Sequence, residues 1–381
     1  MLVVQANDFL YLDYVSTTPL NIEVFNMYQQ LLKQHFVNCD SLYEQAAVVS
    51  KLQEKARMQI AKLLDVKKNE VIFTSGASEA NNMAIKGVAW AMRNKGKHII
   101  TSKVEHSSVM ASMQQLANDF EFDITCLDVN EKGSVSLDDL RKAIRSDTIL
   151  VSIMWINNEI GSINPINEIA EFVKFNSKAY FHVDGVQGFG KYDLNLKNID
   201  LFSISMHKIF GLKGSGILIK KQHVPMLSLV SAGQQEYGLR GGTSNYCVNI
   251  MAAKSVFLAL SNQKDHFTKV KATHDYLISE LKQLPVTINS TDDGSVYIVN
   301  FSCLTIKSEV MMNALNQNNI AVSAQSTCHS RLKEVSHVYQ AMNYGLQQAE
   351  SAIRIGLDYP LSISDIQRFI IELKGIIEKY G

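Results

Sequence analysis

Short apolar runs followed by polar or glycine-rich turns recur along the chain up to about Lys254, and most of these turns open a segment with the apolar spacing of a helix. The runs are EVIFT at 70–74, HIITSKV at 98–104, DITCLDV at 123–129, TILVSIM at 148–154, AYFHVD at 179–184, LFSISM at 201–206 and GILIKK at 216–221. Strands that alternate with helices predict an α/β fold with a parallel, doubly wound sheet.

The pattern changes after Lys254. A long helical pattern at 266–284 is followed by a strand at 296–304, a helix at 308–319, a Ser/Gln/Cys loop and a final helix at 364–380. We therefore predict a large domain at 17–257 and a smaller α+β domain at 258–381. The strand predicted within 1–16 joins the smaller domain, because the ends of a domain often lie close together. Thr17, Thr18 and Pro19 resemble a helix start, with Thr at the N-cap and Pro in the first turn.

Composition limits the classes of function. The chain has 381 residues, 46% of them hydrophobic and 19% charged, which is typical of a folded globular protein. Lys plus Arg equals Asp plus Glu at 37 each, and no basic run is present, so we expect no direct contact with nucleic acid or membrane. The five cysteines lack CxxC spacing, which argues against a disulfide framework and a zinc site. The N-terminus lacks the basic region of a signal peptide, so we expect a cytoplasmic protein.

Polar side chains gather where the predicted strands end. In a doubly wound sheet, ligands bind beyond the carboxyl ends of the strands. The candidate residues at these ends are Ser78, His106, Asn158, Asp184, Gln187 and Lys208. Their common position predicts one shared site.

Lys208 follows a strand and precedes three glycines, Gly211, Gly214 and Gly216. Such an amine forms a Schiff base once burial or a nearby positive charge lowers its pKa. The alternative is an ordinary solvated loop lysine. The carboxylate of Asp184 at another strand end favours the first interpretation.

Together these residues fit pyridoxal phosphate. Lys208 would hold the aldehyde carbon, Asp184 would keep the ring nitrogen protonated, and the helix that opens at Gly76, Ala77 and Ser78 would receive the phosphate. His106 is a candidate for stacking on the ring, and Asn158 and Gln187 for hydrogen bonds to its phenolate oxygen. Taken singly, each residue has an ordinary structural role as a cap or turn former.

Eight motifs now carry a family resemblance. In chain order they are YLDYVSTTP, FTSGASEANN, VEHSSV, INNEIG, HVDGVQGFGK, SISMHKIFGLKGSG, GLRGGTSN and AQSTCHS. The chain resembles the NifS/IscS-type cysteine desulfurases over nearly its whole length. The resemblance implies a fold-type-I pyridoxal-phosphate transferase, with a mainly parallel sheet in its large domain and a smaller α+β domain. It also implies a homodimer with active sites at the subunit interface.

The resemblance assigns roles by position. Lys208 matches the Schiff-base lysine, Asp184 the partner of the ring nitrogen, and His106 the stacking ring. Cys328 matches the nucleophile that takes up sulfur, and Arg354 the group that binds the substrate carboxylate. The phosphate would be held by Ala77, Ser78, Ser205 and His207, with Thr243 contributed by the other subunit; Asn158 and Gln187 would meet the phenolate oxygen, and Asn38 falls on the substrate side.

The implied reaction converts L-cysteine to L-alanine and leaves a persulfide on Cys328. An acceptor protein then takes the sulfur. A scaffold for iron–sulfur clusters and a sulfurtransferase that thiolates tRNA are both open as acceptors.

Three positions depart from the family pattern. The segment NCDSLY at 38–43 lacks the usual proline and histidine, Gln325 replaces a glycine three residues before Cys328, and Asp358 replaces a glycine after Arg354. Because non-glycine residues avoid positive φ, we expect Gln325 to restrict the Cys328 loop. We expect Asp358 to alter the affinity for the substrate carboxylate.

Two other functions stay open at this point. One is a different pyridoxal-phosphate lyase or aminotransferase, such as a selenocysteine lyase, in which Cys328 does not carry sulfur. The other is a non-catalytic platform that binds a sulfur carrier. Cys39 is a second candidate for the relay cysteine, because NCDSLY aligns with the substrate side of the pocket.

Overall fold

The computed structural model describes residues 8–324 and 335–381. Its largest element is a seven-stranded sheet in the order β2-β8-β7-β6-β5-β3-β4. The strands are β2 (Val71–Thr74), β3 (His98–Ser102), β4 (Asp123–Leu127), β5 (Thr148–Ser152), β6 (Tyr180–Asp184), β7 (Leu201–Ser205) and β8 (Gly216–Lys220). All seven coincide with apolar runs identified in the sequence, so the α/β prediction is confirmed.

One strand departs from the expected parallel arrangement. β8 pairs antiparallel with both β7 and β2, while the other neighbours pair parallel. Only the short segment 206–215 separates β7 from β8. Because a parallel return needs a crossover of a dozen or more residues, this connection reverses the chain. The connecting segment 206–215 lies at the end of β7 and contains Lys208.

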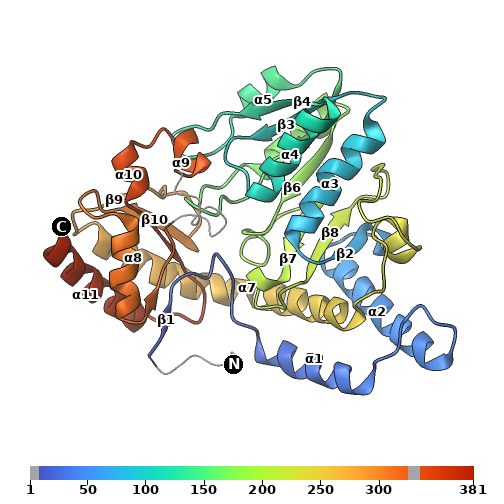
Figure 1. Cartoon of the computed structure of the whole chain (residues 1–381), viewed down its shortest axis with the longest axis horizontal. Coiled ribbons are helices and arrows are strands. Elements are labelled where there is room, and N and C mark those ends of the chain that lie inside the picture. Colours follow the sequence, from blue (N-terminus) through green and yellow to red (C-terminus); the bar gives the residue numbers. More distant parts are fainter. Residues whose placement is uncertain (1–7, 325–334) are drawn as a thin grey trace.

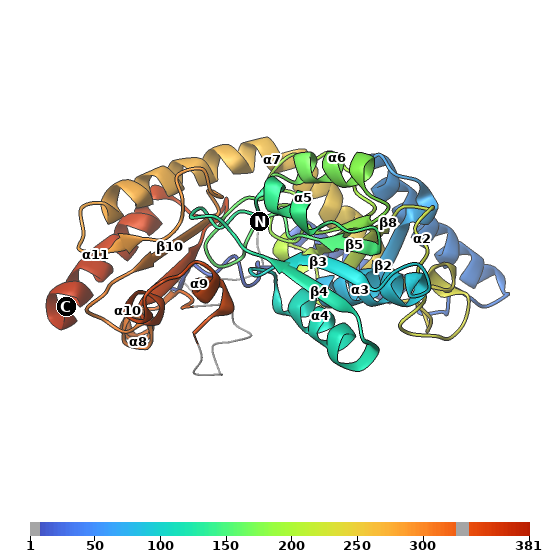
Figure 2. The same cartoon turned by 90° about the horizontal axis from the view of Figure 1, so that it is seen from above.

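Helices cover both faces of this sheet, as Figure 2 shows, with α6 (Ile166–Asn176) and α7 (Tyr246–Leu281) on one face and α3 (Ala77–Met92) and α4 (Ser107–Phe120) on the other. Successive strand residues therefore enter different cores: Phe73 packs in the cluster that contains α7 residues, and Ile72 in the cluster that contains α3 and α4 residues. This explains why the central strands are continuous apolar runs. Three further helices flank these layers, α1 (Ile22–Gln34), α2 (Glu44–Leu63) and α5 (Leu137–Ala143).

The C-terminal part builds a second, smaller sheet (Figure 1, left). Its strands are β9 (Thr287–Ile288), β10 (Ile298–Ser302) and β12 (Ala352–Gly356), all antiparallel. Near it, β1 (Leu10–Tyr11) pairs in parallel with β11 (Ile320–Ala321). The remaining helices are α8 (Ser308–Gln317), α9 (His337–Ala341), α10 (Leu346–Glu350) and α11 (Ile363–Tyr380), and short 3₁₀ turns lie at η1 (Lys68–Glu70), η2 (Met206–Lys208) and η3 (Gln235–Gly238).

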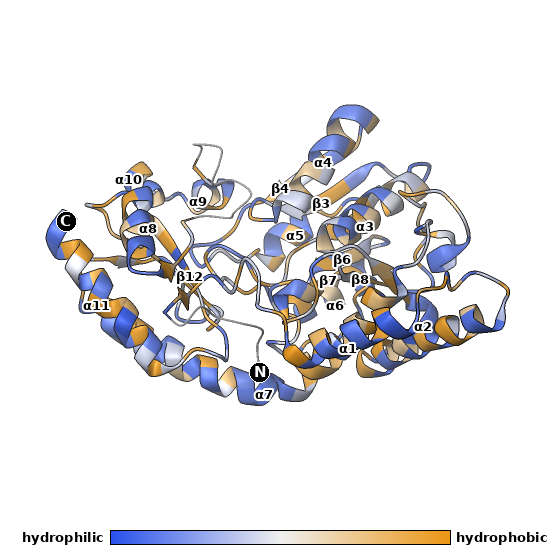
Figure 3. Cartoon of the chain, turned by 60° about the horizontal axis from the view of Figure 1, so that its bottom comes forward, coloured by the Kyte–Doolittle hydropathy of each residue, from blue (hydrophilic) through white to orange (hydrophobic). Residues whose placement is uncertain are grey.

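The long helix α7 joins this part to the rest, and α11 packs on α7 and α8. Figure 3 shows polar and apolar residues alternating around α11, whose buried residues include Ile366, Phe369 and Leu373. α7 runs without a break past residue 257, so it belongs to both parts. The division into domains at 17–257 and 258–381 stays a prediction. No helix of the described ranges is both long and apolar enough to cross a membrane.

The predicted first helix start is wrong. α1 begins after Asn21, whose side chain accepts a hydrogen bond from the backbone nitrogen of Glu23 (2.8 Å). Thr18 instead makes tertiary contacts: its hydroxyl donates to the carbonyl of His207 (3.0 Å) and accepts from the backbone nitrogen of Phe210 (2.7 Å). Thr18 therefore fastens the N-terminal segment to the loop that carries Lys208.

A buried ion pair fixes the edge of the large sheet. The guanidinium of Arg57 in α2 donates to both carboxylate oxygens of Glu236 (2.7 and 2.8 Å) and to the carbonyl of Val71 (2.6 Å). Glu236 also accepts from the backbone nitrogen of Phe73 (2.8 Å). Glu236 and Tyr237 have positive φ, which is unfavourable for residues other than glycine. The ion pair between Arg57 and Glu236 therefore holds an unfavourable turn in place.

We expect Arg57→Leu to lower the free energy of unfolding by about 3–5 kcal/mol, because it leaves the Glu236 carboxylate buried and unpaired. Urea unfolding measures this. The matched control, Arg141→Gln, removes an exposed ion pair with Asp138 and should change the free energy by about 0–1 kcal/mol. Equal effects of the two substitutions would contradict the role given to Arg57.

Candidate active site

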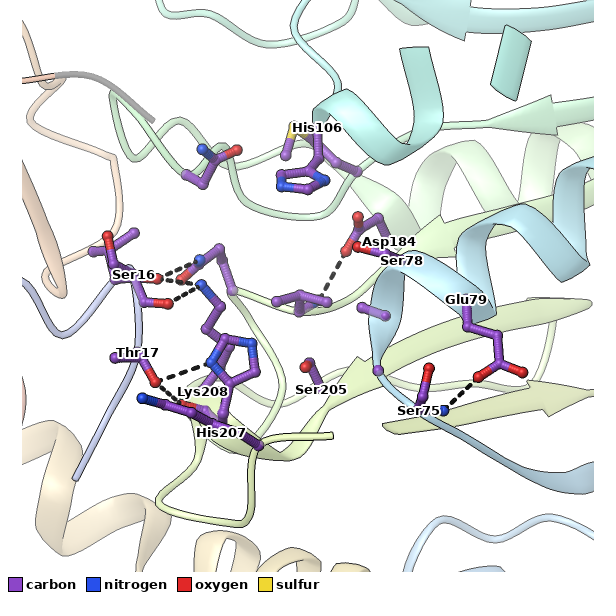
Figure 4. A pocket seen from close by; sticks show the side chains of 18 of the residues that line it. Ser16, Thr17, Ser75, Ser78, Glu79, His106, Asp184, Ser205, His207 and Lys208 are labelled. Atoms are coloured by element: carbon purple, nitrogen blue, oxygen red, sulfur yellow. Dashed lines mark hydrogen bonds between the residues drawn. The ribbon is translucent and has the colours of Figure 1, made fainter. Parts of the chain in front are cut away.

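A cavity of about 570 Å³ opens where the strands of the large sheet end (Figure 4). Residues from β6, β7, the α3 start, the α4 start, the N-terminal segment and β12 meet there. The sequence-predicted residues that line it are Ala77, Ser78, His106, Asn158, Asp184, Gln187, Ser205, His207, Lys208 and Arg354. The expected shared site therefore forms within one chain.

The Lys208 amine lies directly after β7 and is held by the N-terminal segment. Its Nζ donates to the carbonyl oxygens of Val15 (2.6 Å) and Ser16 (2.7 Å). Burial, together with the nearby charges of Arg354 and Lys191, lowers the pKa of Lys208 to about 7, against the opposing effect of the Asp13 and Asp184 carboxylates. Near neutral pH a large fraction of this amine is unprotonated, as a Schiff-base lysine requires.

Asp184 ends β6 and is buried. One carboxylate oxygen accepts from the side-chain amide of Asn81 (2.7 Å) and the other from the backbone nitrogen of Val186 (3.1 Å). These donors fix the orientation of the carboxylate beside the cavity. Asn81 belongs to the motif SGASEANN, but its position in the chain gave no sign of this contact.

The turn before α3 is shaped by close backbone contact. Gly76 has a φ of 153°. A Cβ atom added to Gly216 would lie 2.5 Å from the Cα of Gly76. Only glycine allows the first turn of α3 and the start of β8 to approach this closely. The helix N-terminus, with Ala77 and Ser78, therefore opens directly into the cavity near Ser205, where an anion is stabilised.

His207 and His106 border the cavity from opposite sides (Figure 4). Burial lowers the pKa of His207 to about 4, with Lys208 and Lys213 acting in the same direction, so its ring is neutral at pH 7. Its Nδ1 shares a hydrogen bond with the Thr17 hydroxyl (3.0 Å). His106 caps α4 and accepts from the backbone nitrogen of Ser108 through Nδ1 (3.2 Å), which fixes its ring.

The side-chain amide of Gln187 tests whether the cavity fits the cofactor. Its Nε2 donates to the carbonyl of Val15 (3.2 Å), while its buried Oε1 has no hydrogen-bond partner among the described residues. Unpartnered buried polar atoms are rare and often belong to sites that a ligand completes. The amine, the carboxylate, the helix N-terminus and this orphaned amide together fit pyridoxal phosphate.

Arg354 reaches the cavity from β12 of the small sheet. Its guanidinium donates to the carbonyl of Asn158 (2.8 Å), to the Asp13 carboxylate (2.9 Å) and to the Ser16 hydroxyl (2.8 Å). Its Nε lacks a partner within the described chain. Three groups of the chain therefore hold the Arg354 guanidinium in position at the cavity.

Some predicted residues are not brought to this cavity. Thr243 is exposed in the segment before α7, and Asn38 is exposed in the loop between α1 and α2, where its side chain accepts from the backbone nitrogen of Asp40 (3.0 Å). Cys328 and Gln325 lie outside the described residues. The roles of all four stay predictions.

Asp358 lies in a second cavity that also borders Lys208 and Lys191, rather than among the residues lining the main cavity. Burial raises its pKa to about 6, against the opposing effect of the Lys191 charge. The expected effect of Asp358 on carboxylate affinity would therefore have to act through the groups around Lys208.

Comparison with known proteins identifies the chain. The aminotransferase class-V family matches residues 10–369. The chain belongs to the class-V aminotransferase family. A cysteine desulfurase IscS of Dictyoglomus turgidum is 39% identical over 97% of this chain and 95% of its own length. A second, from Clostridium botulinum strain Hall, is 38% identical over 98% and 95%.

Solved structures agree. A NifS-like protein has a TM-score of 0.92 and 31% identity, covering 97% of this chain and all of its own. SspA in complex with cysteine has a TM-score of 0.80 and 29% identity, covering 91% and 98%. The resemblance drawn from the motifs is confirmed. Pyridoxal phosphate is the cofactor of class-V aminotransferases and cysteine desulfurases, and the residues of the cavity fit it.

The depressed pKa of Lys208 predicts the pH dependence of cofactor attachment. Only the neutral amine reacts, so the rate at which the apo-protein gains visible absorbance from pyridoxal phosphate should rise toward pH 7 and level off above it. Stopped-flow mixing measures this rate. Lys208→Ala should fold, with an unchanged circular dichroism spectrum, and gain no such band. A rate that climbs steadily to pH 10, the range of an ordinary lysine, would contradict the assignment.

Proposed function

We propose that this chain is a pyridoxal-phosphate-dependent cysteine desulfurase that releases L-alanine from L-cysteine and carries the sulfur as a persulfide on Cys328. The central support is the Lys208 amine, which lies partly buried at the strand ends and has a pKa lowered to about 7. Asp184, the α3 N-terminus and Arg354 share its cavity. Relatives named cysteine desulfurase cover almost the whole chain.

The roles of the cavity residues follow from their contacts. When bound, pyridoxal phosphate supplies an electron sink for the negative charge that develops at the substrate Cα. Asp184, oriented by Asn81, would pair with the ring nitrogen, and His106 would pack against the ring. The α3 N-terminus with Ser78, Ser205 and His207 would hold the phosphate, and Thr243 would come from a partner subunit.

Lys208 would act twice, first as the attachment point and then as the base that takes the Cα proton. A pKa of about 7 suits both tasks, because the amine accepts and returns a proton near neutral pH. The neighbouring carbonyls of Val15 and Ser16 accept hydrogen bonds from its protonated form. Arg354, oriented by Asp13, would bind the substrate carboxylate and place the Cα beside the amine.

Sulfur transfer is the step assigned to Cys328. Its thiolate attacks the substrate sulfur, the bond between Cβ and sulfur breaks, and the electron pair stays with the carbon fragment. A new sulfur–sulfur bond forms on the protein, and protonation of the carbon fragment completes alanine. Thiol and cysteine thus give persulfide and alanine, with no external oxidant.

The assembly and the sulfur acceptor belong to the same proposal. Thr243 is exposed, so it is available to complete the phosphate site of a second copy in a homodimer. An acceptor protein would collect the persulfide sulfur in the cytoplasm, for iron–sulfur cluster assembly or tRNA thiolation. Release of alanine from cysteine would separate this function from a binding platform, and a comparison of cysteine with selenocysteine would separate it from a selenocysteine lyase.

Cys328→Ser tests the transfer step. We expect this variant to bind pyridoxal phosphate and to change its visible spectrum on addition of cysteine, but to lose at least about a hundredfold in alanine release, because the described lining of the cavity contains no other cysteine. Persulfide labelling should find no modified cysteine. The matched control is Cys39→Ser: Cys39 is buried and does not line the cavity, so alanine release should persist. The reverse pattern would make Cys39 the relay cysteine.

Dilution tests the homodimer. If Thr243 completes the partner's phosphate site, diluting the protein until it dissociates should release the cofactor, since binding and assembly are then linked. Sedimentation and visible absorbance, recorded over the same dilution series, give the two curves. Monomers that keep their cofactor would contradict a shared site.

A further inference from the structure

Glu79 connects the proposed phosphate turn with the segment that carries Thr243. It lies in the first turn of α3, and its Oε2 accepts from the backbone nitrogen of Ser75 (2.6 Å), as Figure 4 shows. Its Oε1 accepts from Nε of Arg240 (2.9 Å). One carboxylate therefore holds the residue before Gly76 on one side and Arg240 on the other.

The position of this carboxylate creates an electrostatic conflict. Glu79 lines the same cavity as Ser78 and Ser205, where a phosphate would bind. A phosphate monoester carries about two negative charges at neutral pH. A carboxylate in the same helical turn would repel it, unless a positive charge cancels the repulsion.

Arg240 supplies that charge from a segment that is itself held firmly. The backbone nitrogen of Gly241, next to it, donates to the carbonyl of Val230 (3.0 Å), and the hydroxyl of Ser244 donates to Gln53 (2.7 Å). Earlier in the same segment, Glu236 is bound by Arg57. Arg240 is thus positioned before any ligand arrives.

We propose that Arg240 and Glu79 form a positioning pair for the cofactor phosphate: Glu79 shapes the turn, and Arg240 cancels its charge so that the helix N-terminus stays attractive to an anion. The inference rests on the proposed function, because it places the phosphate of pyridoxal phosphate at residues 75–78. Its consequence is specific. Loss of Arg240 should harm phosphate binding only while the Glu79 carboxylate is present.

The experiment measures dissociation constants of the apo-protein for pyridoxal phosphate, inorganic phosphate and pyridoxal, by absorbance and calorimetry. Arg240→Gln should weaken binding of both phosphates about tenfold or more, because it leaves Glu79 unpaired. Glu79→Gln should change it less than about threefold, since glutamine still accepts one of the two hydrogen bonds. The double variant should recover most of the loss, and Arg240→Lys should resemble the wild type. Pyridoxal, which lacks the phosphate, should respond to none of these changes.

Other outcomes overturn the proposal. If the double variant binds phosphate as weakly as Arg240→Gln, or pyridoxal weakens in parallel, Arg240 acts only on the structure. If Arg240→Gln fails to fold, Glu79→Gln decides, because a loss beyond tenfold would refute the cancellation of charge. Arg141→Gln, which removes an exposed ion pair, is the control and should bind as the wild type does.

A failure of the proposed function has a different signature. In that case wild-type apo-protein would gain no visible band with pyridoxal phosphate. If the wild type gains the visible band but the variants do not follow the expected order of phosphate affinities, only the inference about Arg240 and Glu79 is contradicted.

Discussion

The proposed chemistry depends on the partial burial of one amine, that of Lys208. Lys208 lies where β7 turns back into β8, and the carbonyls of Val15 and Ser16 close over it from the N-terminal segment. Thr18 fastens that segment to the Lys208 loop. Burial, with help from the charges of Arg354 and Lys191, lowers the pKa of the amine to about 7. The fold thus gives a strongly basic side chain the pKa that the proposed nucleophile and proton carrier needs at neutral pH.

The second constraint is that both sheets contribute residues to the cavity that Lys208 lines. β12 carries Arg354 from the small sheet into the cavity of the large one, where Asp13 and the carbonyl of Asn158 hold it. A substrate carboxylate bound there would lie between the two parts of the chain.

Much of this could be predicted from sequence, because burial and strand ends leave a pattern. Seven apolar runs gave the strands of the large sheet, and the polar residues after them gave most of the cavity. Long-range contacts left no such pattern. Thr18 was predicted to be a helix cap but forms hydrogen bonds with His207 and Phe210. The carbonyls that accept hydrogen bonds from Lys208 belong to the main chain, so the residue types there do not predict the contact. Thr243 and Asn38 do not line this cavity, so the role of Thr243 in a partner's site and that of Asn38 on the substrate side stay predictions.

The central claim is that Lys208, among the lysines near the cavity, carries the cofactor. Borohydride treatment of the protein loaded with pyridoxal phosphate fixes the cofactor on the lysine to which it is joined, and mass spectrometry of the digested protein locates it. We predict the added mass on the peptide that contains Lys208. Added mass on Lys191 or Lys213 instead, both of which lie close enough to affect this site, would contradict it.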